Sequence, residues 1–392
     1  MAPPKPKAKQ TTKPPPKRSK PTTKPSSSKG KEPTATSPSQ IPLDLQQLLL
    51  NIFATSFPHR LDSDIKPLLQ EIKGHLFNRD FAAAFAKQEF LEAYAVRWSP
   101  SRALGYLQVL EGLRGDLELF DGNGVEDKRV GGDGDRDGME GVRKRCKVVC
   151  LGGGAGAEIV ALAGWMKMMK KEFEQEDGSR PERKEDDVDE TEATAASEPN
   201  ISMEIIAIDI AAWGPVVDKL THGIITNPPL SAYASAAAKQ ANTALLSSGD
   251  INISFHQHDI LNLPPDTLSH ALQDANLVTI MFTLNELYTT SLPLTQSFLL
   301  HLTKSLHLGA ILLVVDSPGS YSTVSLNGAE KRYPMHWLLE YALLGTGGRD
   351  EGERGWVKVR GEVGWWFRLQ EGLRYPIELE NMRMQVHLYR RV

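Results

Sequence analysis

The chain has 392 residues, of which 40% are hydrophobic and 24% are charged, and its formal net charge is −4. That balance is typical of a soluble globular protein, and the sequence contains no apolar run long enough for a membrane-spanning helix. Two cysteines, Cys146 and Cys150, cannot form a disulfide framework, so we expect an intracellular protein with one catalytic domain, a smaller helical attachment and tails.

Residues 1–40 form a segment rich in Lys, Pro, Ser and Thr with almost no acidic residues. Such a composition cannot bury a core, so it predicts a disordered basic tail. A basic arm contacts phosphates without reading sequence, and it can also carry a nuclear import signal. We therefore expect a role in RNA capture or localisation, with a merely solubilising tail as the alternative.

Residues 41–120 have the apolar periodicity of packing helices, which predicts a helical N-terminal region. One stretch within it is unusual, because two arginines and a tryptophan surround a predicted Ser-Pro turn: Arg97, Trp98 and Arg102. These side chains could hold a carboxylate, a phosphate or a base, and a structural stacking pair is the alternative. Residues 121–141, rich in Gly and Asp, are predicted to form a flexible linker.

The stretch from Val148 to Leu162 reads as an apolar strand, a glycine turn and the start of a helix. Glycine supplies the positive φ angles of a tight turn, and its lack of a Cβ lets a ligand approach the backbone. The helix N-terminus behind the turn offers free N–H groups to a cofactor. The predicted cofactor-binding glycines are Gly152, Gly153, Gly154 and Gly156. Their GxGxG spacing alone leaves NAD and other adenosine-bearing cofactors open.

Two acidic residues at strand ends narrow the cofactor class. Asp209 ends an apolar run and is predicted to accept the ribose hydroxyls of an adenosine, with Ile210 packing on one adenine face. Asp259 ends the next strand-like run and is predicted to accept the adenine amine, with Ile260 on the other face. NAD-binding folds do not usually need this second acid, whereas Rossmann-like S-adenosylmethionine (SAM) methyltransferases use it. A turn cap at Asp209 and a plain surface acid at Asp259 are the alternatives.

The rest of the chain is predicted to complete an α/β sheet. The stretch from Lys167 to Asn200 opens with helical character, and residues 168–200 are assigned as a disordered acidic insertion between the first helix and the second strand. The apolar run at residues 276–288 is typical of a buried central strand, and we expect it to end in polar groups at Asn285 and Glu286. A further apolar run ends at Asp316, and an alternating pattern near the C-terminus predicts a last strand.

The motifs RWSPSRAL, VVCLGGGAGAE, AIDIAAW, FTLNELY and VVDSPGSYS resemble, in this order, those of the fungal large-subunit (25S) ribosomal RNA uridine-N3-methyltransferases. The resemblance covers most of residues 41–392. It implies a Rossmann-like class I SAM methyltransferase domain over residues 142–392, with a mostly parallel sheet and a C-terminal antiparallel hairpin. It also implies SAM as the cofactor and ribosomal RNA or a pre-ribosomal large subunit as the partner. We expect a monomer in the nucleus or nucleolus, with the cytoplasm as a second location, and neither a metal nor a membrane partner.

The sequence argues against several other methyl acceptors. C5 methylation of a pyrimidine needs a cysteine nucleophile near the methyl donor, whereas Cys146 and Cys150 lie at or before the first strand. The Asn-Pro-Pro motif of methyltransferases that act on exocyclic amines occurs at Asn227, but it follows the wrong strand and lacks its aromatic residue. The Lys-Asp-Lys-Glu set of 2′-O-methyltransferases is not evident on these strand ends.

Methylation of uridine N3 requires the imide proton to leave before or during the transfer, so a positioned base would help. We predict Glu286 as that base, Asn285 as the residue that holds a uracil oxygen, and Asp316 as the reserve base. A target base inside folded RNA must be flipped out to be reached. The predicted stacking residues are Tyr288, Trp98 and Tyr321. A helix cap at Glu286, a catalytically silent assembly factor and an NAD-dependent oxidoreductase are the alternatives.

Overall fold

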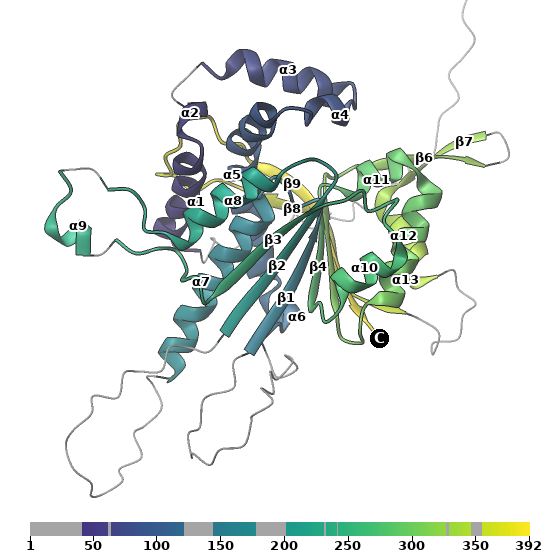
Figure 1. Cartoon of the computed structure of the whole chain (residues 1–392). Helices are drawn as coiled ribbons and strands as arrows, with labels where there is room; N and C mark the ends of the chain where they lie inside the picture. Colours follow the sequence, from purple (N-terminus) through teal and green to yellow (C-terminus); the bar gives the residue numbers. More distant parts are fainter. Residues whose placement is uncertain are drawn as a thin grey trace, which may run out of the picture. The chain divides into compact units, whose positions relative to one another are not determined.

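The structure, a computed structural model shown in Figure 1, describes residues 41–61, 64–120, 144–177, 201–230, 233–240, 242–326, 329–345 and 355–392. The predicted basic tail at residues 1–40 and the predicted linker at residues 121–141 lie outside the described residues. Within the described part of the chain, no helix is both long and apolar enough to cross a membrane.

The central element is a seven-stranded sheet with the order β3-β2-β1-β4-β5-β9-β8. The first five strands in this order pair in parallel, and the last two pairings are antiparallel. The strands are β1 (Lys144–Leu151), β2 (Ile201–Asp209), β3 (Ile251–Gln257), β4 (Leu277–Met281), β5 (Ile311–Asp316), β8 (Trp356–Phe367) and β9 (Met382–Arg391). A separate hairpin joins β6 (Tyr321–Leu326) to β7 (Ala329–Pro334). The predicted α/β class, with a mostly parallel sheet and a C-terminal antiparallel pair, is confirmed.

Each face of the sheet is covered by its own set of helices, because successive side chains of a strand point to opposite faces. Val148 and Cys150 of β1 belong to one core, and Val149 and Leu151 belong to the other. The first core is covered by α1 (Leu43–Ser56), α5 (Gln88–Gly112), α7 (Ala157–Asp177) and α8 (Gly214–Ile225). The second is covered by α10 (Pro265–Leu272), α11 (Leu284–Thr290), α12 (Leu292–Ser305) and α13 (Met335–Leu344), as Figure 1 shows. The shorter helices are α2 (Pro58–Leu61), α3 (Lys66–Phe77), α4 (Phe81–Ala84), α6 (Arg114–Leu117) and α9 (Ala236–Gln240).

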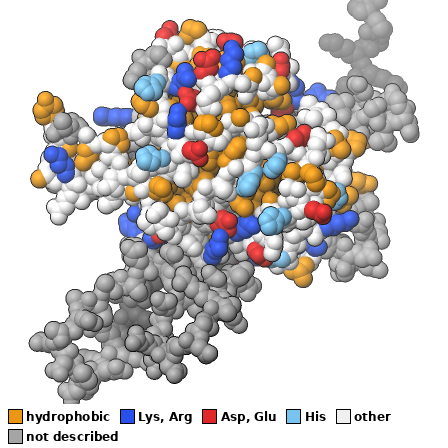
Figure 2. All heavy atoms as spheres, viewed as in Figure 1, with side chains coloured by type: hydrophobic (Ala, Val, Ile, Leu, Met, Phe, Trp, Pro, Cys, Tyr) orange, Lys and Arg blue, Asp and Glu red, His pale blue; other side chains and the backbone are white. Residues whose placement is uncertain are grey.

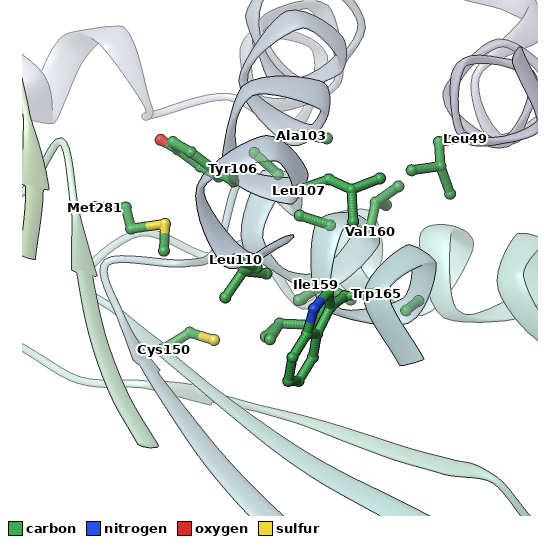
Figure 3. Close-up of a cluster of buried hydrophobic side chains, with 14 of the residues drawn as sticks. Leu49, Ala103, Tyr106, Leu107, Leu110, Cys150, Ile159, Val160, Trp165 and Met281 are labelled. Carbon is green, nitrogen blue, oxygen red and sulfur yellow. The ribbon is translucent and has the colours of Figure 1, made fainter. Parts of the chain in front are cut away.

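Helices α5 and α7 pack closely against each other and hold the N-terminal helices to the sheet (Figure 3). A Cβ on Gly164 of α7 would lie 2.8 Å from Cδ1 of Leu49, so the absence of a side chain lets α1 approach. The apolar face of α7 continues through Met169, and Lys170 forms an ion pair of 2.6 Å with Asp250. The prediction of a disordered insertion is therefore corrected for residues 168–177, which are helical, while residues 178–200 lie outside the described residues.

The predicted Ser-Pro turn is wrong, because α5 runs without a break through Pro100. Proline has no N–H to donate to the carbonyl oxygen four residues earlier, which here belongs to Val96. The hydroxyl group of Tyr375 donates to that oxygen instead, at 2.9 Å. The neighbouring Ser99 hydroxyl donates to the carbonyl oxygen of Ala155, at 2.7 Å. The helix thus keeps its proline and is tied directly to the glycine turn.

Candidate active site

A cavity of ≈ 640 Å³ lies at the carboxyl ends of the parallel strands. In a sheet of this kind the ligand crevice opens where the strand order reverses, which here is between β1 and β4. The volume is in the range of small-molecule sites, about 300–1,000 Å³. The predicted site residues that line the cavity are Arg102, Gly152, Asp209, Ile210, Asp259, Ile260, Asn285, Glu286 and Asp316.

The glycine turn between β1 and α7 is confirmed, but most of its glycines accommodate protein rather than ligand. Gly152 and Gly156 have φ angles of +86° and +81°, a region that favours glycine. A Cβ on Gly154 would lie 2.2 Å from Cδ1 of Trp213. Of the four predicted glycines, Gly152 lines the cavity, whereas Gly153, Gly154 and Gly156 do not. Trp213 therefore occupies space that the sequence prediction assigned to a cofactor.

Asp209 lies at the end of β2 with its carboxylate in the cavity wall. Its Oδ2 accepts the backbone N–H of Gly154 at 3.1 Å, and its Oδ1 accepts that of Ala211 at 3.2 Å. Burial raises the pKa of the Asp209 carboxyl to about 6, although these two hydrogen bonds oppose the shift. The carboxylate thus caps the following turn and still borders the cavity, where it can accept hydroxyl groups of a ribose.

Asp259 and Ile260 lie in the loop after β3 and line the same cavity. The Asp259 carboxylate accepts the N–H of Leu261 at 3.0 Å and the side-chain amide of Asn262 at 2.7 Å. Ile260 is buried in the second core. An acceptor and an apolar side chain therefore line the cavity after β3, the strand that pairs with the strand of Asp209, and an adenine ring could contact both.

Arg102 brings a positive charge into the cavity wall. Its Nη1 donates to the hydroxyl oxygen of Tyr94 at 2.6 Å, and its guanidinium carbon lies 5.0 Å from the centre of the Phe282 ring. Among the described residues, no acid forms an ion pair with Arg102. A guanidinium with unused donors fits the carboxylate of a ligand, because charge-assisted pairs of this kind are the strong ones.

The other two members of the predicted arginine–tryptophan cluster do not line the cavity. Arg97 is buried and forms an ion pair with Glu380. Trp98 packs against Tyr94 with ring centres 4.8 Å apart. The structural alternative is therefore the better description of Arg97 and Trp98, whereas Arg102 is placed for a ligand.

Asn285 and Glu286 lie in the first turn of α11 and not at a strand end, so the strand prediction for residues 276–288 is wrong beyond β4. Oδ2 of Asp316, at the end of β5, accepts the backbone N–H of Asn285 at 3.1 Å. A carboxylate at the free N–H groups of a helix N-terminus stabilises that helix. A contact with the neighbouring strand therefore starts the helix inside an apolar run.

The Asp316 carboxylate is buried and fully engaged in hydrogen bonds. Besides Asn285, it accepts the backbone N–H of Ser317 at 2.7 Å and the hydroxyl of Ser320 at 3.2 Å. Burial raises its pKa, and these hydrogen bonds oppose the shift. Such a carboxylate is better suited to holding α11 and the turn after β5 than to removing a proton from a substrate.

Glu286 and Asn285 face the cavity from α11. Nη1 of Arg79 lies 3.4 Å from Oε2 of Glu286 and donates to Oγ1 of Thr289 at 2.9 Å. Both charged side chains are partly exposed, so we expect the pair to add only about 0–1 kcal/mol to stability. Oδ1 of Asn285 is buried and has no hydrogen-bond partner among the described residues. The side-chain amide nitrogen of Asn285 lies 3.4 Å from Oε1 of Glu286, so the two side chains lie together in the cavity wall.

The sequence prediction missed one wall of the cavity. This wall, called here the α3–α4 segment, runs from the last turn of α3 through α4 to the residue after it. The residues are Leu76, Phe77, Arg79, Phe81 and Phe85. Phe77 is 89% exposed, and Arg79 has a φ angle of 56°, which is uncommon for a residue other than glycine. The sequence carried no signal for this wall, because the burial of Leu69 and Ile72 and the exposure of Phe77 follow from tertiary packing.

None of the three predicted stacking residues, Trp98, Tyr288 and Tyr321, lines the cavity. Tyr288 is 3% exposed and belongs to the second core, where its hydroxyl accepts the side-chain amide of Gln296 at 3.2 Å. Its predicted role is wrong, because α11 turns the side chain inward. Tyr321 begins β6 and is 49% exposed, with the guanidinium carbon of Arg332 5.7 Å from its ring centre.

A second hollow of ≈ 400 Å³ lies over β2 and β3 beside α10. Its lining includes Lys147, His256, His258 and His270, and Figure 2 shows histidine and hydrophobic side chains gathered on this face. His258 and Ile208 line both cavities. No group of three or more His, Cys, Asp or Glu in the described residues is arranged to hold a metal ion.

A protein-family model described as "Putative SAM-dependent methyltransferase" matches residues 53–390. The chain belongs to this family. A 25S rRNA (uridine(2843)-N(3))-methyltransferase of Saccharomyces cerevisiae is 30% identical over 359 residues, which are 91% of this chain and 86% of the relative. Among solved structures, a SAM-dependent methyltransferase from Methanosarcina mazei is 8% identical with a TM-score of 0.32, and the match covers 64% of this chain and 94% of that one. A 16S rRNA (adenine(1408)-N(1))-methyltransferase from Catenulisporales acidiphilia is 12% identical with a TM-score of 0.30. That match covers 63% of this chain and 88% of the other.

Membership of the family decides between the cofactors that the glycine turn left open: the methyltransferase uses SAM. The cavity fits it, since Asp209 would hold the ribose, Asp259 and Ile260 the adenine, and Arg102 the carboxylate of the methionine part. When bound, SAM supplies a methyl group carried on a positively charged sulfur.

Proposed function

We propose that this methyltransferase modifies N3 of a uridine in large-subunit ribosomal RNA. The name of the Saccharomyces cerevisiae relative supports the reaction class. The observation that carries the proposal is the presence of two neighbouring polar side chains, Asn285 and Glu286, in the wall of the cofactor cavity. A uracil imide presents an N–H group between two carbonyl oxygens. A carboxylate can accept that N–H, and the NH₂ group of an amide side chain can donate to one of the carbonyl oxygens.

In this proposal residues of α11 and of the α3–α4 segment together bind and activate the uracil. Glu286 would accept the N3 proton, and the nitrogen would take the methyl group as the bond from that group to the SAM sulfur breaks and a neutral thioether leaves. Asn285 orients the uracil edge. Negative charge develops on the two carbonyl oxygens of the uracil, and the guanidinium of Arg79, beside Glu286, stabilises it. Most of the remaining rate enhancement comes from positioning the two reactants.

The cysteines support an N3 acceptor over a C5 acceptor. Cys146 and Cys150 are buried in the first core, away from the cavity lining. Burial raises the pKa of the Cys146 thiol to about 12 and that of Cys150 well above its usual value. A buried, protonated thiol is a poor nucleophile, so neither cysteine is suited to attack a pyrimidine ring as C5 methylation requires.

The cellular setting is part of the same proposal. The basic composition of residues 1–40 supports a nuclear or nucleolar location and non-specific RNA capture. We also propose that the enzyme acts as a monomer, with the cytoplasm as a second location. Microscopy of a fluorescent fusion with and without residues 1–40, and sedimentation of the purified chain, test these points.

Mass spectrometry of ribosomal RNA nucleosides tests the reaction. Deletion of the gene should remove 3-methyluridine from large-subunit RNA, and the wild-type chain should restore it whereas the variant Glu286→Gln should not. Unchanged 3-methyluridine after deletion would refute the proposal. Restored growth or ribosome assembly by a chain that forms no 3-methyluridine even as the wild type would instead favour an assembly factor without catalysis.

A further inference from the structure

The antiparallel end of the sheet extends beyond the cavity edge. Gln385 of β9 lies opposite Asp316, the last residue of β5, and Trp366 of β8 lies opposite Arg383. Because β9 runs against β5, residues of β9 that precede Gln385 lie past the carboxyl end of β5. That is the end of the sheet where the cofactor cavity opens, and Asp316 is part of its lining.

Trp366 carries an aromatic surface at this end, and two arginines lie over it. Its side chain is 41% exposed, and the guanidinium carbons of Arg368 and Arg383 lie 5.3 Å and 5.6 Å from its ring. Both arginines are exposed, and neither has an acidic partner among the described residues. The three side chains, called here the β8–β9 platform, hold positive charge that the protein leaves uncompensated.

A second exposed aromatic–arginine pair follows the turn after β5. Tyr321 follows the turn after β5 and has the guanidinium of Arg332 5.7 Å from its ring centre. The carbonyl oxygen of Ser317, in that turn, accepts the side-chain amide of Gln385 at 2.9 Å, and Ser317 lines the cavity. The turn that precedes Tyr321 is therefore joined directly to β9, the strand that carries Arg383.

We propose that the β8–β9 platform binds single-stranded RNA next to the nucleotide that enters the cavity. A base would stack on Trp366, and the flanking phosphates would contact Arg368 and Arg383. Aromatic rings accept any base by stacking, and arginines neutralise phosphates. The chain as a whole carries a formal net charge of −4, so RNA attraction has to come from local groups of cations, such as the basic residues 1–40 and the arginines of the platform. The inference rests on the proposed function, since it names how the same RNA substrate is held.

The test compares the full-length wild type with Trp366→Ala, with the double variant Arg368→Gln/Arg383→Gln, and with Trp337→Ala as the matched control. Trp337 of α13 is also exposed, at 57%, but no arginine lies over its ring in the described part of the chain. The probe is unmodified large-subunit rRNA transcribed in vitro. The measurements are RNA affinity at several salt concentrations, SAM affinity by calorimetry, and KM and kcat for the RNA.

Trp366→Ala should weaken RNA binding by about 5- to 100-fold, as loss of one stacked base does. The double arginine variant should also reduce the salt dependence, by about 0.7 in slope for each lost phosphate contact with a single strand. KM for the RNA should rise more than kcat falls. SAM affinity should stay unchanged, and this unchanged affinity also shows that the variants are folded. Trp337→Ala should behave as wild type.

Unchanged RNA affinity and KM in both platform variants would overturn the inference, and so would an equal loss in Trp337→Ala. Loss of a protein contact with RNA binding intact would assign the platform to a protein partner and refute it equally. Failure of the proposed function gives a different result: wild-type enzyme would form no 3-methyluridine, whatever the platform variants bind.

Discussion

Nη1 of Arg79 lies 3.4 Å from Oε2 of Glu286, so the α3–α4 segment and the first turn of α11 meet in the wall of the cavity. Arg79 belongs to the helical N-terminal region, and Glu286 belongs to a helix of the methyltransferase domain. The region that the sequence presents as an attachment is therefore part of the site where the acceptor would bind.

Replacing Glu286 with Gln keeps its size and removes the basic carboxylate. We expect kcat to fall by about 10²–10⁴, as for loss of a general base, while SAM affinity holds. The loss should shrink as pH rises towards the ionisation of the uracil imide, because an ionised substrate needs no base. Steady-state kinetics across pH on an RNA substrate measures both effects.

Arg79→Gln is the control for this experiment. If Glu286 served only to hold Arg79, the two variants would show equal losses with parallel pH profiles. A base predicts a larger loss for Glu286→Gln that shrinks as pH rises, whereas Arg79→Gln, which removes a positive charge from the site, should lower kcat less. A drop in SAM affinity for Glu286→Gln would instead assign the residue to the cofactor.

The Asp209 carboxyl, whose pKa burial raises to about 6, predicts that SAM binding depends on pH. Only the ionised form can accept both ribose hydroxyls, so the affinity should be complete well above pH 6 and should fall as pH drops through it. Bound SAM favours the ionised form, so binding near this pH should release protons. Calorimetry of the wild type at several pH values measures the trend, and Asp209→Asn should give a weaker, flat response. A wild-type affinity that is constant from neutral to acidic pH would remove Asp209 from the ribose site.

Arg102 and Arg97 form a matched pair for testing the carboxylate site, because they lie on one helix five residues apart in the sequence and only Arg102 lines the cavity. Arg102→Gln should weaken SAM by about 1.5–3 kcal/mol, the usual value of a hydrogen bond to a charged group. Arg97→Gln breaks an ion pair with Glu380, so it should lower the unfolding temperature and leave SAM affinity unchanged. Calorimetry and thermal unfolding of both variants separate the roles. Equal effects on SAM would contradict the assignment.

The sequence predicts the sheet well because its signals are local. Buried strands such as β5 are continuous apolar runs, and the acids that follow β2 and β3 come at fixed places in the strand–turn–helix order. The signal for the start of α11 is not local. The helix begins where the Asp316 carboxylate, at the end of β5, accepts the backbone N–H of Asn285. The position of Trp213 against Gly154 is likewise a tertiary contact. The α3–α4 wall could not be predicted for the same reason, because the periodicity of a helix gives its apolar face but not what it covers.

The hydrogen bond from Tyr375 to the carbonyl oxygen of Val96 predicts a coupled effect on stability. Tyr375→Phe leaves that buried carbonyl without a partner, which should cost about 1–3 kcal/mol in the free energy of unfolding. Pro100→Ala restores a backbone N–H four residues after Val96, so the helix can supply the missing donor itself. In that background Tyr375→Phe should cost less, with a coupling of about 0.5 kcal/mol or more. Urea unfolding of the wild type, the two single variants and the double variant gives the coupling free energy of this double-mutant cycle. Strictly additive changes would mean that the tyrosine does not compensate for the proline.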